Sequence, residues 1–398
     1  MTIKGCHVMA KPSGSACNLG CDYCFYLEKE KLYPERQVNW KMSDETLNQF
    51  IQQHIDAQAG MDVEFAWQGG EPTLLGIEFF ERVIELCEKH RGQKQIHHSF
   101  QTNGVLINDK WCELFKKHGF LIGISIDGPE DLHDHYRLTR SRKGTYNKVM
   151  DAVELLKKHQ IDFNTLTVVN DKNVKHPLRV YEFLKSIGSG FIQFIPLLER
   201  KHSESQELIL SAPSEPYGKV TQWSVSPVEY GDFLNSIFDY WVRNDVGKTF
   251  VQTFDSTLAT WINGTSSVCV FSKSCGHAFA LEANGDLYQC DHYVYPKYKL
   301  GNIHHQTIHD MNNSEMAIEF GLSKSTTLNG ECKRCRYLPL CNGGCPKHRF
   351  STSFSGKPNH NYLCTGYFKY FEHTENAMKI MRMLVLSKKP AFLVNRYL

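Results

Sequence analysis

The sequence predicts an α/β protein in which a sheet of parallel strands precedes a small, cysteine-rich C-terminal domain. Strand-like and helix-like segments alternate through the first half of the chain. Three cysteines lie close together near the start, and eight of the 14 cysteines lie between Cys269 and Cys364. The alternation predicts the sheet, and the cysteine density predicts a region held together by metal rather than by a large apolar core.

Six candidate strands define the first half of the chain. They are expected at His7–Ala10, Val63–Trp67, Ile96–Gln101, Leu121–Ile126, Asn164–Val169 and Phe191–Ile195. Helices are expected near Asp44–Ala57, Phe79–His90, Asp109–His118, Tyr146–His159 and Lys175–Ser186, where apolar residues recur at helical spacing. This alternation favours a parallel sheet with right-handed crossovers. Six such strands can form an open or a closed barrel.

Composition suggests where the later boundaries fall. The polar segment Leu198–Gln222 is expected to be a loop or a domain edge. A helix then begins with Ser226 as its N-cap, Pro227 in its first position and Glu229 completing a capping box. A last helix is expected at about Tyr367–Leu386. We therefore expect a main domain at 1–222, a helical connector at 223–264, a cysteine-rich domain at 265–366, and a helix and tail at 367–398.

Charge and hydropathy exclude several classes of function. The 398 residues carry a formal net charge of +2, which gives no electrostatic footprint for nucleic acid or an anionic membrane. No apolar run is long enough to span a bilayer, and the N-terminus lacks the apolar core of a signal peptide. We expect a cytoplasmic protein, in which cysteines stay reduced and serve as metal ligands or reactive thiols.

The first cysteine group follows the first strand directly. Cys17, Cys21 and Cys24 have the spacing C-x3-C-x2-C. A structural zinc site needs four protein ligands, and this loop offers three, although His7 could complete such a site. Three thiolates can instead hold three irons of a four-iron cluster and leave the fourth iron open to substrate. Zinc, or three buried thiols, remains the alternative.

This spacing resembles that of the radical S-adenosylmethionine superfamily. The resemblance implies a partial (β/α)6 barrel similar to a TIM barrel, with the cysteine loop at the C-terminal end of the first strand. It also implies a [4Fe–4S] cluster whose open iron binds the methionine part of S-adenosylmethionine. Reduction of that cluster releases a 5′-deoxyadenosyl radical, so the cofactor supplies the difficult chemistry.

The same resemblance implies the residues that contact S-adenosylmethionine. Gln68-Gly69-Gly70-Glu71 follows the second strand and resembles the GGE motif, in which glycines allow close backbone approach. The other implied contacts are Tyr23, Ser125, Arg137 and Leu198. The residues alone also permit a simple Gly-Gly turn, a strand-end hydroxyl at Ser125 and a surface ion pair at Arg137.

The second cysteine group provides eight thiols, enough for two sites with four ligands each. Two zinc ions are the main alternative, because zinc ribbons also use C-x2-C pairs. The spacing resembles that of the SPASM domain, which holds two auxiliary [4Fe–4S] clusters through cysteine. The resemblance assigns Cys269, Cys275, Cys290 and Cys345 to one cluster and Cys332, Cys335, Cys341 and Cys364 to the other. Four thiolates on each cluster leave no open iron, which implies a role in electron transfer.

Across nearly the whole chain the motifs resemble those of anaerobic sulfatase-maturating enzymes. The matching pieces include Cys24-Phe-Tyr-Leu, Trp67-Gln-Gly-Gly-Glu-Pro-Thr-Leu, Gln101-Thr-Asn-Gly, Ser125-Ile-Asp-Gly and Gly285-Asp-Leu-Tyr-Gln-Cys-Asp-His. This family oxidises a cysteine or serine of a sulfatase to Cα-formylglycine, and the motifs do not separate the two types of target. The implied partners are an unfolded or nascent sulfatase segment and an electron donor such as flavodoxin or ferredoxin.

Asp291 matches the general base of that family. It follows Cys290 directly, so a proton acceptor and a cluster ligand are neighbours in sequence. Asp127 and Glu71 are competing carboxylates, and Asp291 could instead cap a turn. Cys87 and Cys112 are expected to be small core residues. No partner is predicted for Cys6, and Lys201–Ser224 is expected to shape substrate access.

Two other functions stay open on the sequence. One is a different SPASM enzyme that forms thioether or carbon–carbon crosslinks in a precursor peptide. Such enzymes often carry a further domain ahead of the barrel, and the short segment before Cys17 argues against one here. The other is a zinc-stabilised binding protein without catalysis, which would require all the motifs to coincide by chance.

Overall fold

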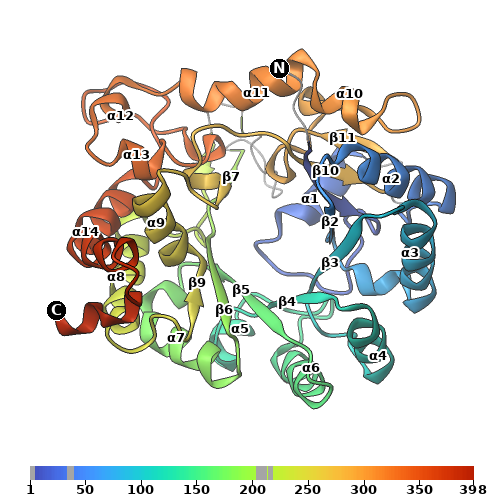
Figure 1. Ribbon diagram of the computed structural model, residues 1–398, viewed down its shortest axis with the longest axis horizontal. Helices are drawn as coiled ribbons and strands as arrows, with labels where there is room; N and C mark the ends of the chain where they lie inside the picture. Colours follow the sequence, from blue (N-terminus) through green and yellow to red (C-terminus); the bar gives the residue numbers. More distant parts are fainter. Residues whose placement is uncertain (1–4, 34–39, 203–212, 214–217) are drawn as a thin grey trace. The chain divides into compact units, whose positions relative to one another are not determined.

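The computed structural model describes residues 5–33, 40–202, 213 and 218–398 (Figure 1). These residues group into two compact units, and neither unit is one continuous stretch of sequence. The first comprises Met1–Ser125, Asp134–Phe163 and Gly276–Gly321, and the second comprises Ile126–His133, Asn164–Cys275 and Leu322–Leu398. The domain boundaries expected from composition remain predictions.

The first unit is built on a mixed sheet. Its spatial order is β12 (Lys299–Asn302), β11 (Asp286–Tyr288), β10 (Ala278–Glu282), β1 (His7–Lys11), β2 (Asp62–Trp67), β3 (Gln95–Thr102) and β4 (Leu121–Ser125). Strands β10, β1, β2, β3 and β4 run parallel, whereas β11 and β12 are joined antiparallel. The N-terminal strand therefore pairs with a strand of the cysteine-rich region, with Lys11 opposite Glu282. The predicted α/β class is confirmed, and the described strands do not close a barrel.

The helices of the first unit begin where the sequence supplies caps. Helix α2 (Asp44–Ala57) follows Ser43, whose hydroxyl accepts a hydrogen bond from Thr46 N–H at 3.1 Å. Helix α4 (Asp109–His118) follows Asn108 and ends at Gly119 in the left-handed conformation. The predicted helices are present. The remaining helices of this unit are α1 (Phe25–Leu32), α3 (Ile77–His90), α6 (Tyr146–Lys158) and α10 (Ile308–Asn312). Helix α11 (Glu315–Thr326) begins in the first unit and ends in the second.

Aromatic side chains form the core of the first unit. Phe65 and Trp67 of β2 stack with ring centroids 5.8 Å apart, and Phe80 of α3 meets Phe100 of β3 edge to face at 5.0 Å. All four side chains are buried. Because burying one such side chain contributes about 1.5–3 kcal/mol, these rings fix α3 against the sheet.

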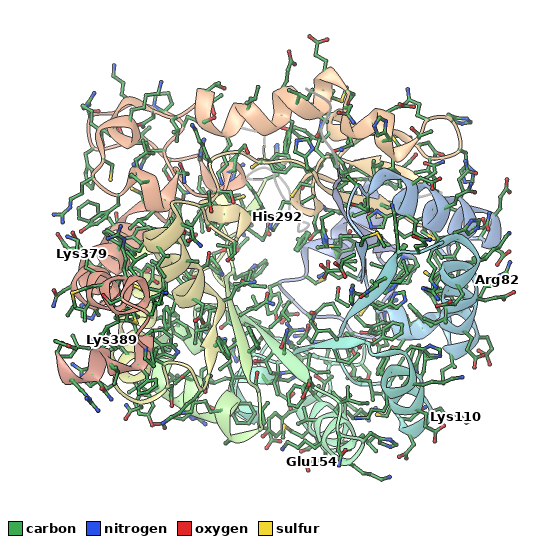
Figure 2. All side chains as sticks on the ribbon, viewed as in Figure 1. Arg82, Lys110, Glu154, His292, Lys379 and Lys389 are labelled. Carbon is green, nitrogen blue, oxygen red and sulfur yellow. The ribbon has the colours of Figure 1, made fainter. Side chains whose placement is uncertain are left out.

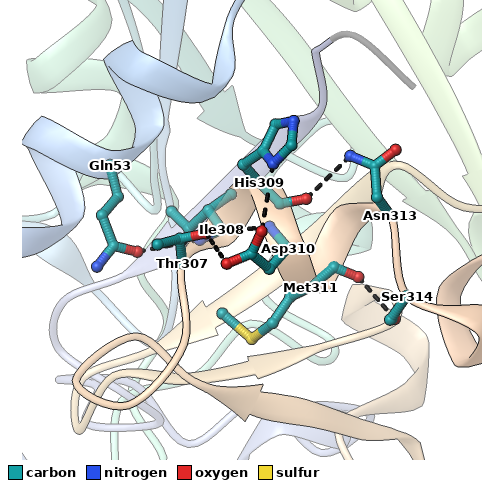
Figure 3. A network of polar contacts seen from close by, with 8 residues as sticks. All are labelled: Gln53, Thr307, Ile308, His309, Asp310, Met311, Asn313 and Ser314. Carbon is teal, nitrogen blue, oxygen red and sulfur yellow. Dashed lines mark hydrogen bonds and ion pairs between the residues drawn. The ribbon is translucent and has the colours of Figure 1, made fainter. Parts of the chain in front are cut away.

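Helix α10 ties the cysteine-rich sequence to α2 (Figure 3). Gln53 of α2 accepts a hydrogen bond from Ile308 N–H at 3.0 Å and donates one to the carbonyl of Ile303 at 2.9 Å. Thr307 caps α10 by accepting a hydrogen bond from Asp310 N–H at 3.1 Å. The segment after β12 is therefore part of the same unit as the N-terminal strand.

The second unit contains three parallel strands and the longest helices. Strands β5 (Phe163–Val169), β6 (Phe191–Pro196) and β9 (Phe250–Val251) pair in that order. The longer helices are α7 (Pro177–Ser186), α8 (Pro227–Asn244), α9 (Gln252–Asn263) and α14 (Cys364–Leu386). Shorter helical turns are α5 (Glu130–His133), α12 (Gly330–Arg334) and α13 (Leu338–Cys341). No helix in the described part of the chain is long and apolar enough to cross a membrane.

Two details of this unit differ from the sequence prediction. The segment expected as a loop carries a short antiparallel pair, β7 (Arg200–Lys201) and β8 (Lys219–Val220), and most residues between them lie outside the described ranges. The last helix begins at Cys364 rather than near Tyr367, because Asn361 caps the turn before it through Leu363 N–H at 2.9 Å. In contrast, the predicted capping box of α8 is confirmed. Ser226 donates a hydrogen bond to the Glu229 carboxylate at 2.7 Å and accepts one from Glu229 N–H.

Helices α8 and α14 cross at a pair of glycines. A Cβ added at Gly231 would lie 2.9 Å from the Cα of Gly366, and one added at Gly366 would lie 2.1 Å from the carbonyl oxygen of Pro227. Both distances are shorter than real Cβ contacts. The helices therefore approach each other at a distance that only glycine permits, and this contact fixes the start of α14, where Cys364 lies.

We predict that Gly366→Ala destabilises the protein by about 1–3 kcal/mol, because the new methyl group forces two packed helix backbones apart. The measurement is urea unfolding of the intact protein under oxygen-free conditions. Gly190→Ala is the control, since nothing lies within 4 Å of a Cβ at Gly190. Equal stability of the two variants would contradict the proposed crossing.

Candidate active site

The first cysteine loop connects β1 to α1. Leu19 N–H donates a hydrogen bond to the sulfur of Cys17 at 3.4 Å, and Cys24 N–H donates one to the carbonyl of Cys21 at 3.1 Å. Burial raises the pKa of the Cys17 thiol to about 12, and the charges of Glu71 and Cys24 add to that rise. A thiolate at Cys17 therefore requires a metal or a positive charge beside it.

The Gly-Gly-Glu segment after β2 is hydrogen-bonded to the backbone that leads into the cysteine loop. Gly70 N–H donates to the carbonyl of Gly14 at 2.8 Å, and Glu71 N–H donates to that of Ala16 at 2.9 Å. A Cβ at Gly70 would lie 2.1 Å from the oxygen of Ala16. The sequence predicts that these glycines let a ligand approach the backbone closely. At Gly70 the backbone that leads into Cys17 already lies this close, so a glycine is required there.

Glu71 braces this arrangement. Its carboxylate accepts hydrogen bonds from Thr73 N–H at 3.0 Å, the Thr73 hydroxyl at 2.7 Å, the Thr102 hydroxyl at 2.8 Å and Asn103 N–H at 2.8 Å. Burial raises the pKa of Glu71, whereas the hydrogen bonds from Asn103 and Thr73 lower it. A carboxylate engaged by four donors of its own chain joins β2 to β3, and it is poorly placed to act as a base.

Asn103 extends the brace to the first cysteine. Its amide donates to the side-chain oxygen of Asn18 at 2.8 Å and to the sulfur of Cys17 at 3.7 Å. The motif Gln101-Thr-Asn-Gly carries part of the family resemblance, but the sequence alone predicts no role for Asn103. Its position directly after a strand was the signal that could have indicated one.

Two predicted cofactor contacts lie at the ends of β2 and β4, which flank β3 in the sheet of this unit. The side-chain oxygen of Gln68 is buried and has no hydrogen-bond partner among the described residues. The hydroxyl of Ser125 accepts a hydrogen bond from the Gln101 amide at 3.0 Å. A buried oxygen without a donor fits a ligand that carries an ammonium group, as S-adenosylmethionine does.

Tyr23 and Arg137 are brought together as predicted residues of one site. The Arg137 guanidinium carbon lies 5.7 Å from the centre of the Tyr23 ring, and both side chains are largely buried. The segment around Arg137 is tied to the cysteine loop through Gly20 N–H, which donates to Leu138 O at 2.8 Å, and through Arg140, which donates to Cys17 O at 3.1 Å. Leu198 is buried in the second unit, after β6.

Asp291 begins a short 3-10 turn, Asp291–Tyr293, in the first unit. Its carboxylate forms an ion pair with Lys11, the last residue of β1, whose side chain is 1% exposed. Lys29 of α1 donates to the backbone oxygen of Asp291 at 3.0 Å. The Lys11 ammonium also lies 3.6 Å from the centre of the Tyr26 ring. The neighbouring residue His292 is labelled in Figure 2.

These positive charges set the ionisation of Asp291. Burial alone raises the pKa of the carboxyl group, but the charges of Lys11, His292 and Lys29 and the hydrogen bond from Lys11 outweigh it. The pKa of Asp291 therefore lies well below its ordinary value, and the group is a carboxylate at neutral pH. The sequence predicts Asp291 as the base but not its contacts with Lys11 and Tyr26, because these depend on β1 lying beside β10.

In the second unit, electrostatic interactions divide seven cysteines into two groups. Burial raises the pKa of Cys275 to about 12, and the charges of Cys345 and Cys269 add to the rise. Burial also raises the pKa of Cys364 to about 12, with further contributions from Cys341, Cys332 and Cys335. All 14 cysteines are free of disulfides, so these thiols are available as ligands.

The ligand assignment itself remains a prediction. The second group holds the four cysteines that the resemblance assigns to one cluster, and the first holds three of the four assigned to the other. Cys290 belongs to the first unit. Among the described residues, no three His, Cys, Asp or Glu side chains converge as ligands of one metal ion. In an iron–sulfur cluster each thiolate binds a separate iron, so two groups of buried thiols fit such clusters.

Comparisons with known proteins identify both parts of the chain. The radical SAM superfamily matches residues 12–184, and the SPASM iron–sulfur cluster-binding domain matches residues 269–336. The serine-type anaerobic sulfatase-maturating enzyme of Bacteroides thetaiotaomicron is 45% identical over 388 residues, covering 97% of this chain and 93% of that protein. A cysteine-type enzyme of Clostridium perfringens is 36% identical over 371 residues, covering 92% and 95%.

A solved structure agrees with these relatives. Native anSMEcpe with bound AdoMet and Cp18Cys peptide matches with a TM-score of 0.83 and 34% identity, covering 95% of this chain and 99% of that one. The likeness therefore extends over both cysteine regions and over the segments between them. The chain belongs to the anaerobic sulfatase-maturating enzymes of the radical SAM superfamily.

Proposed function

We propose that this protein oxidises a serine or cysteine of a sulfatase to Cα-formylglycine through a 5′-deoxyadenosyl radical. The observation that carries this proposal is the likeness to serine-type and cysteine-type maturating enzymes over nearly the full length of both chains. The substrate is a sulfatase segment, unfolded or nascent, that binds in an extended conformation. Both kinds of relative match, so both side chains are candidate targets.

The residues of the first unit hold the cofactors in this proposal. Cys17, Cys21 and Cys24 bind the cluster that S-adenosylmethionine completes, and the buried oxygen of Gln68 accepts a hydrogen bond from the methionine ammonium group. Gly69 and Gly70 shape the same loop, Ser125 and Arg137 bind the carboxylate and ribose region, and Tyr23 contacts the adenine. When bound, S-adenosylmethionine and this cluster would supply the radical, and the two auxiliary clusters would serve as electron acceptors.

Asp291 acts as the general base. Converting a serine CH2OH or a cysteine CH2SH to the aldehyde level removes a hydrogen atom from Cβ, followed by one proton and one electron. The Asp291 carboxylate takes the proton from the hydroxyl or thiol. A serine gives the aldehyde directly, whereas a cysteine gives a thioaldehyde, which water hydrolyses to the aldehyde with release of hydrogen sulfide. Lys11 keeps Asp291 ionised, so the group is in the carboxylate form that a proton acceptor needs.

The reaction also needs an electron donor, and we propose that it takes place in the cytoplasm. An electron donor such as flavodoxin or ferredoxin reduces the first cluster, and no nucleic acid or membrane takes part. A cytoplasmic location fits free cysteines in a chain with 14 of them, since reducing compartments keep thiols unpaired.

The direct test is turnover of short sulfatase peptides that carry either serine or cysteine at the target position. We predict that the reconstituted protein forms an aldehyde, detected by mass spectrometry and hydrazone formation, with stoichiometric 5′-deoxyadenosine. An alanine peptide is the control and gives no aldehyde. Formation of a thioether or carbon–carbon crosslink in place of the aldehyde would assign the chain to a different SPASM activity.

The first cysteine loop is tested by Cys17→Ala. We predict loss of reductive S-adenosylmethionine cleavage, because the substrate-binding cluster loses one of its three ligands. Cys112→Ala is the control, since Cys112 is a buried residue of α4. Cleavage by Cys17→Ala at the rate of the control would remove this loop as the cluster site.

The base is tested by Asp291→Asn. We predict that S-adenosylmethionine cleavage is retained while aldehyde formation falls by about 10²–10⁴-fold, the usual contribution of a general base. Asp310→Asn is the control, because Asp310 is an exposed aspartate of α10 in the same unit (Figure 3). Full aldehyde formation by Asp291→Asn would exclude Asp291 as the base.

A further inference from the structure

Arg349 is a buried cation with no carboxylate partner in the described part of the chain. It is 6% exposed, and its guanidinium donates only to backbone carbonyls. The acceptors are Gly343 O at 3.0 Å, Lys324 O at 2.6 Å, Asn342 O at 3.0 Å and Gly344 O at 3.3 Å. Carbonyl dipoles satisfy its hydrogen bonds but do not neutralise its charge. Burying an uncompensated charge is costly, so the fold must supply negative charge nearby.

Arg349 is hydrogen-bonded to a turn that lies, in sequence, between a cysteine of one group and a cysteine of the other. Asn342, Gly343 and Gly344 all have positive φ, at 46°, 73° and 63°. They connect Cys341, from one proposed ligand set, to Cys345, from the other. A Cβ at Gly343 would lie 2.3 Å from the Leu328 side chain, and one at Gly344 would lie 2.4 Å from the Asn361 amide. The turn is tightly packed, and Arg349 is held against it by hydrogen bonds to the carbonyls of all three turn residues.

Lys324 is a second buried cation of the same kind. Its side chain is fully buried, and its ammonium donates to Cys269 O at 2.6 Å and Val270 O at 3.0 Å. No described carboxylate pairs with it. The Arg349 guanidinium also donates to the backbone carbonyl of Lys324, so a hydrogen bond links the two residues.

Cysteine thiolates, which carry a negative charge when they bind a cluster, are the groups that can compensate both cations. Burial lowers the pKa of Arg349, whereas the charges of Cys332, Cys275, Cys345 and Cys341 raise it. Burial likewise lowers the pKa of Lys324, and the charges of Cys275, Cys345 and Cys269 raise it. Arg349 thus interacts with members of both cysteine groups, and Lys324 with the group of Cys269, Cys275 and Cys345. An arginine keeps its proton in proteins.

We propose that Arg349 is a shared counter-charge for both auxiliary clusters, assisted by Lys324 at one of them, and that it raises their reduction potentials. A fixed positive charge beside a cluster stabilises the reduced form, which carries one more negative charge, and net charge is among the factors that set cluster potentials. This inference rests on the proposed function, in which the auxiliary clusters take the electron from the substrate. Arg349 touches no reacting atom and acts only through the electron acceptor.

The test is a redox titration followed by electron paramagnetic resonance on the full-length, cluster-loaded protein. All variants carry Cys17→Ala, Cys21→Ala and Cys24→Ala, so that only the auxiliary clusters titrate. Arg349→Gln removes the charge, Arg349→Lys keeps it, and Lys324→Gln removes the second cation. Lys379→Gln is the control, because Lys379 is an exposed residue of α14 that pairs with Glu375 (Figure 2).

We expect Arg349→Gln to shift the reduction equilibrium of both auxiliary clusters at least tenfold toward the oxidised form, about 59 mV for one electron. Lys324→Gln should shift chiefly one cluster, and Arg349→Lys and Lys379→Gln should stay near the parent. Unchanged potentials in Arg349→Gln and Lys324→Gln would overturn the proposal. Equal shifts in Arg349→Gln and Arg349→Lys would also overturn it, because the hydrogen-bonded turn and not the charge would then set the potentials.

Metal content separates this inference from the proposed function. About eight irons per chain in the triple-alanine background show that both auxiliary clusters are present, whatever their potentials. Zinc in their place would contradict the proposed function before any potential is measured. If Arg349→Gln loses iron, Lys324→Gln decides: a lowered potential supports the counter-charge, and an unchanged one excludes it.

Discussion

The structure depends on one constraint, which is the cost of burying ionised thiolates. Cysteines bind iron as anions, and burial raises the pKa of thiols such as Cys17, Cys275 and Cys364. The chain places hydrogen-bond donors and cations around them to offset this cost. At the first loop these donors are Leu19 N–H and the Asn103 amide, and in the second unit Arg349 and Lys324 lie among the cysteines.

Strand β1 connects the cofactor loop to the proposed base. It lies between β2 and β10, so its C-terminal end meets segments from both ends of the chain. Beyond Lys11 the chain enters the cysteine loop, which Gly70 supports from β2. The side chain of Lys11 forms an ion pair with Asp291, which follows β11. A single buried lysine therefore relates the position of the first cluster loop to that of the carboxylate proposed to take the substrate proton.

Most of the secondary structure could be predicted because its signals are local. The capping box at Ser226 and Glu229 and the periodicity of α2 and α4 need only a few neighbouring residues. The cysteine motifs were also readable from their spacing. The pairing of Lys11 with Asp291 was not, since it joins residues 280 positions apart through the contact of β1 with β10. The role of Glu71 was not predictable either, because two of the donors that engage its carboxylate come from the end of β3 and the residue after it.

Three iron–sulfur clusters are the cofactors on which the proposed function depends. The most direct measurement is the content of iron, sulfide and zinc per chain after strictly oxygen-free purification. We predict about twelve irons with matching sulfide and no zinc, as three four-iron clusters require. About four irons together with zinc would keep the radical site but make the cysteine-rich region structural. Zinc without iron, under conditions that preserve clusters, would contradict the account.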